Sequence, residues 1–289
     1  MKKLILKHDL DIGDVLMMTI AVRDLHMAHP QQYQTDIRTR WPDIWANNPY
    51  ITPMKDGEGE LIEIGYPLIQ NAGSMCFADA FRLDLADKLN IEIPWTIHNP
   101  DLYVTDKEKS ENIVLNKLKY PGKFWVLNAG YKPDAVLKYY PFWQEVVDLL
   151  KNKIQIVQIG ASGDIHPQLE NVFNLVGQTN VRELIKLVYQ SEGTIGPISC
   201  QMVLAAAFNK PSVCVAGGKE GKRWQMYNYH RYLNVNGCLP CAPGNGCWTA
   251  KFEDCKSRAG NVPRCFAMIS PEEVARNVLL YYGGGALKF

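Results

Sequence analysis

The chain alternates short apolar runs with stretches in which apolar residues recur at helical spacing. Residues 3–6 form an apolar run typical of a buried strand, and Val15–Met27 carries apolar side chains three and four positions apart, which predicts a helix. A less regular strand is expected at Gln34–Arg38 and a helix at 75–90. Residues 39–74 are rich in Pro, Asn and Gly and give little regular signal.

The second half of the chain repeats this alternation more clearly, and its apolar runs end in or just before glycine. The predicted strands lie at 124–130, 154–160, 193–196 and 212–216, and the predicted helices at 142–151, 181–190, 201–208 and 271–282. Strands that alternate with helices imply a mostly parallel sheet. Glycines such as Gly130 and Gly160 then place ligand-binding loops at the carboxyl edge of that sheet.

Length and pattern together favour two domains. A chain of 289 residues suits two domains of roughly 100–200 residues each. The extended polar segment 91–106 and the charged segment 107–119 precede Tyr120-Pro121-Gly122, where the periodic signal resumes. We therefore expect an N-terminal domain at 1–120 and a C-terminal domain at 121–289.

Composition excludes several classes of protein. Hydrophobic residues make up 47% and charged residues 21%, as in an ordinary globular protein. The net charge of +1 gives no support for binding to nucleic acid or to a membrane surface. No apolar run reaches the roughly 18 residues of a transmembrane helix. Charges at Lys7, His8 and Asp9 cut the first apolar run too short for a signal peptide, so we expect a cytoplasmic protein.

Five of the eight cysteines lie between Cys238 and Cys265. In a reducing compartment such a cluster is more often a metal site than a disulfide framework. Cys238 and Cys241 form a CxxC pair, and Cys255 and Cys265 are the preferred remaining ligands, with Cys247 the rival for either place. Four thiolates would hold a structural zinc or iron and leave no catalytic position open; free thiols are the alternative.

Asp14 and Lys138 are two charged residues that each have a chemical and a structural interpretation. Asp14 follows Gly13 in the turn Asp11–Asp14 before a predicted helix, where the helix dipole favours its ionised form. Such a carboxylate either takes a proton from an attacking hydroxyl or caps the helix. Lys138 is either a point charge for a diphosphate or a solvated lysine before a helix.

Three blocks of sequence, in order, resemble glycosyltransferase family 9, the ADP-heptose lipopolysaccharide heptosyltransferases. The first block is Ile12–Thr19 with Arg23 and Pro30, and the second is Asn128-Ala129-Gly130 with Leu137–Pro141. The third is Leu175–Thr179 with Arg182-Glu183-Leu184, followed by Gly196–Pro211. Each block alone is a weak motif, but three in the family's order over most of the chain are fairly specific.

The resemblance implies a GT-B fold, in which two Rossmann-like domains face a cleft, the first on the acceptor side and the second binding the nucleotide sugar. It implies an inverting, metal-independent transfer of a sugar, heptose in the family, from a nucleotide-diphosphate donor to a glycan or protein hydroxyl. Asp14 matches the family's catalytic base and Lys138 the lysine associated with the donor phosphate. The other expected donor contacts are Gly13, Asn128, Gly130, Gly160, Thr179, Ser199, Cys200, Gln201 and Met202. Thr179 has an alternative role, shared with Asn180, as the cap of the helix that follows.

The chain differs from the family at one of these expected contacts and at two positions next to them. Ile198 stands where the family has an aspartate, Cys200 where it has a glycine and Val203 where it has a histidine. The missing aspartate and histidine allow an alternative function, a catalytically degenerate protein that binds a nucleotide or a partner. Relatives that modify autotransporter proteins carry a cysteine-bound iron finger in the region of residues 237–266, with longer spacings than here.

Overall fold

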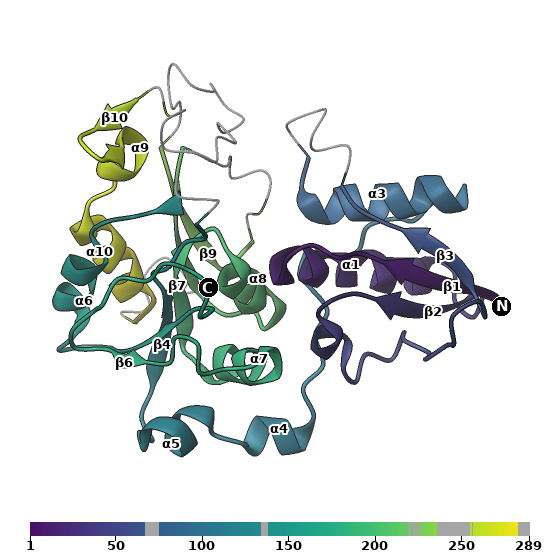
Figure 1. Ribbon diagram of the computed structural model, residues 1–289, viewed down its shortest axis with the longest axis horizontal. Helices are drawn as coiled ribbons and strands as arrows, with labels where there is room; N and C mark the ends of the chain where they lie inside the picture. Colours follow the sequence, from purple (N-terminus) through teal and green to yellow (C-terminus); the bar gives the residue numbers. More distant parts are fainter. Residues whose placement is uncertain are drawn as a thin grey trace. The chain divides into compact units, whose positions relative to one another are not determined.

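The computed structural model describes residues 1–66, 75–133, 138–218, 221, 225, 227–235, 255 and 257–282 of the chain, which divide into two compact units (Figure 1). The first comprises Met1–Ser110 and the described part of Arg223–Tyr227; the second comprises the described parts of Glu111–Lys222 and Asn228–Phe289. The boundary between the two units thus lies before Glu111, whereas the sequence pattern placed it near Tyr120. It lies earlier because Ile113 and Val114 are buried in the core of the second unit.

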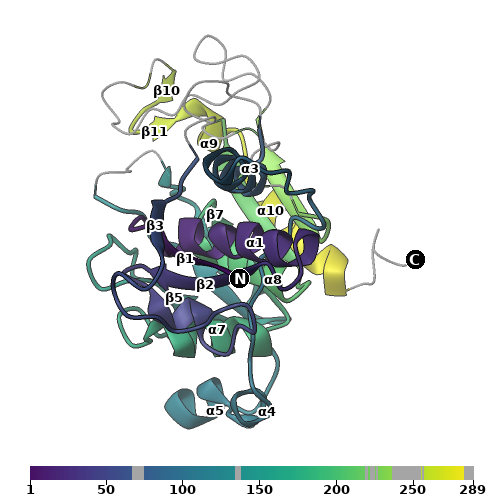
Figure 2. The ribbon, with the colours of Figure 1, turned by 90° about the vertical axis from the view of Figure 1, so that its right-hand side faces the viewer.

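The first unit is built on a parallel sheet of three strands in the order β2-β1-β3. These strands are β1 (Lys2–Lys7), β2 (Tyr33–Arg38) and β3 (Glu60–Glu63). Helix α1 (Ile12–Ala28) packs against α3 (Phe77–Leu89), as Figure 2 shows. Every residue of α1 from Val15 to Leu25 is buried, so the helix is covered on all sides. The short helices η1 (Pro42–Trp45) and α4 (Asp106–Ser110) complete the unit.

The second unit contains a six-stranded sheet in the order β6-β5-β4-β7-β8-β9, with every neighbouring pair parallel. The strands are β4 (Phe124–Asn128), β5 (Gln155–Ile159), β6 (Phe173–Asn174), β7 (Gly193–Pro197), β8 (Ser212–Gly217) and β9 (His230–Asn234). Counted from β4, this is the strand order 3-2-1-4-5-6 of doubly wound nucleotide-binding domains. Its topological switch point lies between β4 and β7, where such folds bind ligands.

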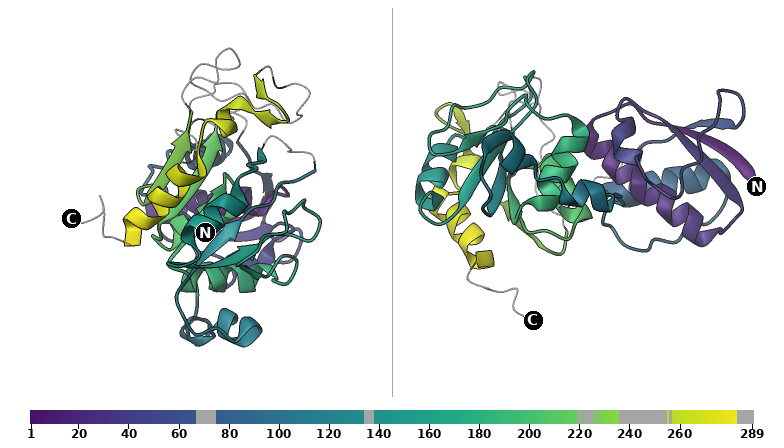
Figure 3. Two further views of the ribbon diagram at one scale, coloured as in Figure 1. Left: turned by 90° about the vertical axis from the view of Figure 1, so that its left-hand side faces the viewer. Right: turned by 90° about the horizontal axis from the view of Figure 1, so that it is seen from below.

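Helices cover both faces of this sheet. Trp125 and Leu127 of β4 pack in a cluster with α6 (Trp143–Leu150) and α10 (Pro271–Tyr282), which lie side by side (Figure 3). Phe124 and Val126 point to the other face, in a cluster with α5 (Ile113–Leu118) and α7 (Val181–Gln190). This two-residue alternation between two apolar faces explains why the strand reads as a continuous apolar run. The remaining elements are α8 (Cys200–Ala207), α9 (Arg264–Ala267), β10 (Arg258–Ala259) and β11 (Val262–Pro263).

The predicted α/β architecture with parallel sheets is confirmed. Helices α7 and α10 have the bounds that the pattern predicts. One local expectation is wrong: α1 begins at Ile12, so Gly13 and Asp14 lie in its first turn and not in a turn before it. Among the helices that the structure describes, none combines the length and the apolar character needed to cross a bilayer.

Candidate functional site

The first unit presents Asp14 at the start of α1. Asp11 is the N-cap residue and Asp14 is the third helical residue, and together they form a capping box. The backbone N–H of Asp11 donates to Asp14 Oδ2 at 3.2 Å. The cap alternative is therefore realised in the geometry, and the half-buried carboxylate is held at the positive end of the helix dipole.

Residues that the sequence analysis missed anchor the loop before α1. The Arg40 guanidinium donates to the carbonyl oxygen of Asp9, and Trp41 Nε1 donates to that of Leu10 at 2.9 Å. His8 Nδ1 lies 2.8 Å from the carbonyl oxygen of Ile64, and burial lowers the pKa of His8. These contacts fix the approach to Asp14 from outside the helix itself. No local motif marks them, since they join segments far apart in sequence.

The second unit gathers its candidate residues at the switch point between β4 and β7. Asn128, at the end of β4, accepts a hydrogen bond from the backbone N–H of Gly130 at 3.1 Å. Its amide nitrogen donates to Ser199 Oγ at 3.4 Å and to Gln201 Oε1 at 3.3 Å. Gln201 Nε2 donates to the carbonyl oxygen of Pro197 at 2.7 Å. Because Gln201 is fully buried and both ends of its amide are used, its side chain positions the loop.

Lys138 joins this group from the chain that follows β4. Its ammonium donates to the carbonyl oxygen of Ile198 at 3.0 Å, next to Ser199, the N-cap residue of α8. A half-buried positive charge and the N-terminus of a helix therefore meet at one edge of the sheet. Both features favour anions, and phosphate groups above all.

Gln201 and Met202, two of the expected donor contacts at the start of α8, are fully buried. Met202 is fully buried, and its Sδ lies 2.7 Å from the Sγ of buried Cys214. Ile198 and Val203, which replace the family's aspartate and histidine, are 3% and 1% exposed. Of the segment Ser199–Met202, only Ser199 and Cys200 are half-buried and so partly open to solvent.

His166, another residue missed by the sequence analysis, occupies the space above two glycines. A Cβ atom added to Gly130 or to Gly160 would collide with its imidazole ring. His166 Nε2 lies 2.9 Å from the carbonyl oxygen of Ala161, and its buried Nδ1 has no hydrogen-bond partner among the described residues. The two glycines are therefore needed here for the close packing of this ring.

Gly177 and Asn180 shape the loop after β6. The Gly177 N–H donates to the carbonyl oxygen of Gly160 at 2.8 Å, and its φ of 69° is in the left-handed region that favours glycine. Asn180 caps α7, because its side chain accepts from the Glu183 N–H at 2.8 Å. Thr179 precedes the cap and is half-buried, so the capping role falls to its neighbour.

The cysteine finger predicted at 237–266 is described only at its end. Cys238, Cys241 and Cys247 lie outside the described residues. The Cys255 thiol donates to the carbonyl oxygen of Ser257 at 3.2 Å. Cys265 belongs to α9 and is 5% exposed, within a core cluster of the second unit. The metal site of the finger therefore stays a prediction. Within the described residues, Cys76, Asp79 and His98 form a group with metal-binding chemistry.

No protein-family model matches the sequence, and no curated protein matches it either. Solved structures do match over most of its length. A glycosyltransferase from enterotoxigenic E. coli, TibC, described as iron-containing and dodecameric, matches with a TM-score of 0.72 and 14% identity, covering 98% of this chain and 78% of TibC.

Two further structures extend the match. The E. coli ADP-heptose lps heptosyltransferase II gives a TM-score of 0.67 at 15% identity, covering 99% of this chain and all of that one. A glycosyltransferase family 9 protein from Veillonella parvula gives 0.62 at 12% identity, covering 81% and 86% of the two chains. The chain thus has the fold of the family 9 heptosyltransferases, and the resemblance predicted from three motif blocks is confirmed.

Proposed function

We propose that this protein is an inverting glycosyltransferase that moves a sugar, heptose in the first instance, from a nucleotide diphosphate to a hydroxyl of a glycan or protein. The observation that carries the proposal is the meeting of Lys138, Ser199 and Asn128 at the switch point of the second unit. That place combines a cation with a helix N-terminus in a fold that binds nucleotides at this edge.

In the second unit, the Lys138 ammonium and the N-terminus of α8 stabilise the donor diphosphate. Lys138 is held 3.0 Å from the Ile198 carbonyl oxygen, so its charge is positioned before the donor arrives. Preorganised charge of this kind stabilises the negative charge that builds up on a leaving group. Asn128 supports the arrangement by bonding both Ser199 and Gln201.

In the first unit, Asp14 acts as the general base. Its carboxylate takes the proton of the acceptor hydroxyl, and the hydroxyl oxygen forms the new bond to the anomeric carbon. The bond from that carbon to the diphosphate oxygen breaks, and the electron pair leaves with the nucleoside diphosphate. Attack opposite the leaving group inverts the anomeric configuration.

ADP is the first nucleotide to test. A TibC structure is described as a complex with ADP-D-beta-D-heptose, and E. coli heptosyltransferase WaaC, with a TM-score of 0.53, as a complex with ADP. We expect ADP to raise the melting temperature of the protein, because a ligand that binds the native state stabilises it. UDP and GDP serve as competitors that share the diphosphate and differ in the base.

Lys138→Ala tests the diphosphate site, and Lys153→Ala, an exposed lysine after α6, is its matched control. We expect Lys138→Ala to raise the Kd for ADP about tenfold, which corresponds to a loss of about 1.4 kcal/mol of binding free energy. Lys153→Ala should bind ADP as the parent does. Equal ADP affinity of all three proteins in calorimetric titration contradicts the proposed site.

The burial of Ile198 and Val203 favours one alternative function, a nucleotide-binding protein that carries out no transfer. Neither side chain offers a polar group to a donor sugar. In that case ADP still binds and Lys138→Ala still weakens it, but no sugar leaves ADP-heptose in the presence of any acceptor. Release of ADP from the sugar nucleotide separates the two functions.

A structural iron or zinc held by Cys238, Cys241, Cys255 and Cys265 remains part of the proposal. Its support is the CxxC pair and the description of TibC as iron-containing. Elemental analysis of protein purified without added metal tests it, with about one equivalent per chain expected.

A further inference from the structure

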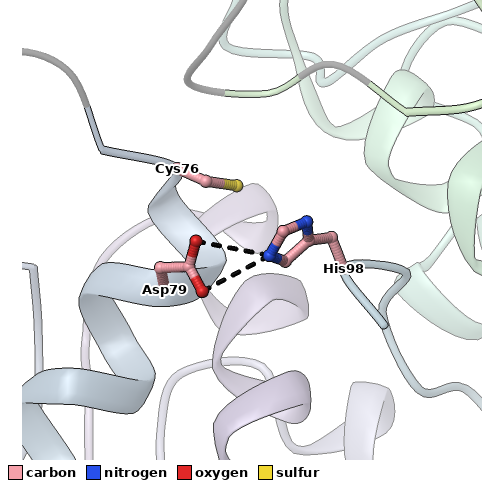
Figure 4. Close-up of side chains that lie close together, drawn as sticks. All are labelled: Cys76, Asp79 and His98. Carbon is pink, nitrogen blue, oxygen red and sulfur yellow. Dashed lines mark hydrogen bonds and ion pairs between the residues drawn. The ribbon is translucent and has the colours of Figure 1, made fainter. Parts of the chain in front are cut away.

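Three side chains of the first unit converge where α3 begins (Figure 4). Cys76 is the N-cap residue of α3, Asp79 lies in its first turn, and His98 comes from the segment that follows the helix. One ligand atom from each, Sγ, a carboxylate oxygen and an imidazole nitrogen, lies within 4.8 Å of the other two. His98 Nε2 is 3.3 Å from the Asp79 carboxylate.

The backbone on both sides of His98 is fixed by a buried ion pair on α1. Arg23 donates to the carbonyl oxygen of Asn99 at 2.8 Å and also to that of Ile97. Its partner Asp24, fully buried, accepts from the Thr96 hydroxyl at 2.6 Å. His98 is thus held by the fold, although its own side chain is 37% exposed.

Asp79 is also held in place. Arg82 donates to Asp79 Oδ1 at 3.1 Å and also to the carbonyl oxygen of Ile93, so it ties the segment before His98 to α3. Burial raises the pKa of the Cys76 thiol, and the backbone N–H groups of Ala78 and Asp79 offset part of that shift. A bound cation would remove the thiol proton, because thiolate is the form that binds metal.

We propose that Cys76, Asp79 and His98 bind a divalent transition metal of the zinc type, with the fourth position open to water or a ligand. Sulfur, imidazole and carboxylate are the ligands that Zn²⁺ takes, at about 2.3, 2.0 and 2.1 Å. In a tetrahedral site such bonds put the ligand atoms roughly 3.3–3.7 Å apart. Metal binding would draw the three ligand atoms together from separations of up to 4.8 Å, and the Asp79 oxygen that Arg82 does not bind would face the metal. None of its three ligands belongs to the cysteine finger, and the proposal does not depend on the proposed transferase activity.

The simpler alternative is an ion pair between Asp79 and His98 that merely ties the segment to α3. In that case Cys76 has no share in the group and added metal changes nothing. The two possibilities differ in the chemistry of the Cys76 thiol, which can be followed by itself. Trypsin releases it in the peptide 56–82, in which Cys76 is the single cysteine.

The test measures alkylation of Cys76 by iodoacetamide in the reduced, chelator-treated full chain, with and without Zn²⁺. We expect Zn²⁺ to slow alkylation about tenfold or more in the parent, and His98→Gln and Asp79→Asn to lose this protection. His29→Gln, which changes another histidine of the first unit, should keep it. Protection that is absent in the parent, or unchanged in His98→Gln, overturns the proposal.

Cobalt gives a second readout that does not depend on the access of the alkylating reagent. Co²⁺ bound to a thiolate produces a sulfur-to-metal charge-transfer band in the near ultraviolet. We expect the parent to bind one more equivalent of Co²⁺ than Cys76→Ser, with a matching loss of that band. Equal stoichiometry in the two proteins overturns the proposal, whatever metal the finger cysteines hold.

Discussion

Replacing Asp14 by asparagine separates a catalytic base from a helix cap, because the two roles predict effects on different quantities. Asparagine keeps an oxygen that can accept the Asp11 N–H, now bonded at 3.2 Å, but it cannot take up a proton. As a base, Asp14 contributes about 10²–10⁴-fold to the rate, or about 2.7–5.4 kcal/mol of activation free energy.

The stability effect of Asp14→Asn should be much smaller. The variant loses the interaction of a charge with the helix dipole, about 0.3–1 kcal/mol, and keeps the cap hydrogen bond. A loss of 1 kcal/mol lowers the melting temperature of a unit of roughly 110 residues by about 4 °C. We therefore expect turnover of ADP-heptose to fall at least about a hundredfold, while the melting temperature falls by a few degrees at most and ADP affinity is unchanged.

Asp11→Ala is the matched control, because exposed Asp11 forms the other half of the capping box. It should cost about 1 kcal/mol of stability and leave turnover close to that of the parent. If Asp14→Asn keeps near-normal transfer, Asp14 is only a cap and the mechanism proposed above is wrong. If both variants lose the same turnover, the orientation of α1 matters and not the carboxylate itself.

Three further changes test buried groups of the two units. Arg23→Met leaves Asp24 charged and fully buried, so we expect a loss of about 3–5 kcal/mol and faster hydrogen exchange at residues 94–101; an unchanged melting temperature contradicts this. Gly196→Ala places a Cβ 2.7 Å from the carbonyl oxygen of Asn128, which should lower the free energy of unfolding by about 1–3 kcal/mol. It should also weaken ADP binding, as measured by calorimetry. Burial lowers the pKa of His230 to about 3, so between pH 6.5 and that value the unfolded chain binds the extra proton. Stability should therefore fall as the pH falls, by about 1.4 kcal/mol per pH unit, and denaturant titrations should show a flatter profile for His230→Gln.

Periodicity predicts the elements that carry a strong apolar pattern and misses those that do not. Helix α7 shows apolar residues on one stripe and a capping signal at Asn180, so both of its ends are predicted. Strand β3 lies in a segment rich in Pro, Asn and Gly, and only Ile62 of its four residues is buried. A short strand at the edge of a sheet, open to water over most of its length, has no apolar alternation to detect.

The candidate sites divide in the same way. Asn128, Lys138 and Ser199 are predicted, because they follow strands of one parallel sheet and the family motif marks them. His166 is missed, since its role depends on the packing of its ring over two glycines from different loops. The Cys76, Asp79 and His98 group is missed for a related reason. Tertiary contacts through Arg23 and Arg82 bring the three residues together, and no spacing along the chain predicts the group.

The replacement of the family's aspartate by Ile198 alters the chemistry of the second unit and leaves its scaffold intact. Ile198 is buried, so its side chain adds apolar packing, while its carbonyl oxygen still binds Lys138. In the proposed function, donor recognition at this loop would rest on backbone groups, Lys138 and Ser199, which a diphosphate can use whatever sugar it carries. Loss of ADP affinity in Lys138→Ala is accordingly expected whether or not the protein transfers a sugar. Loss of turnover without loss of ADP affinity in Asp14→Asn is expected only if the protein transfers a sugar. The pair of variants thus distinguishes an active transferase from a binding protein, even if the assay follows hydrolysis of the sugar nucleotide, with water in place of the natural acceptor.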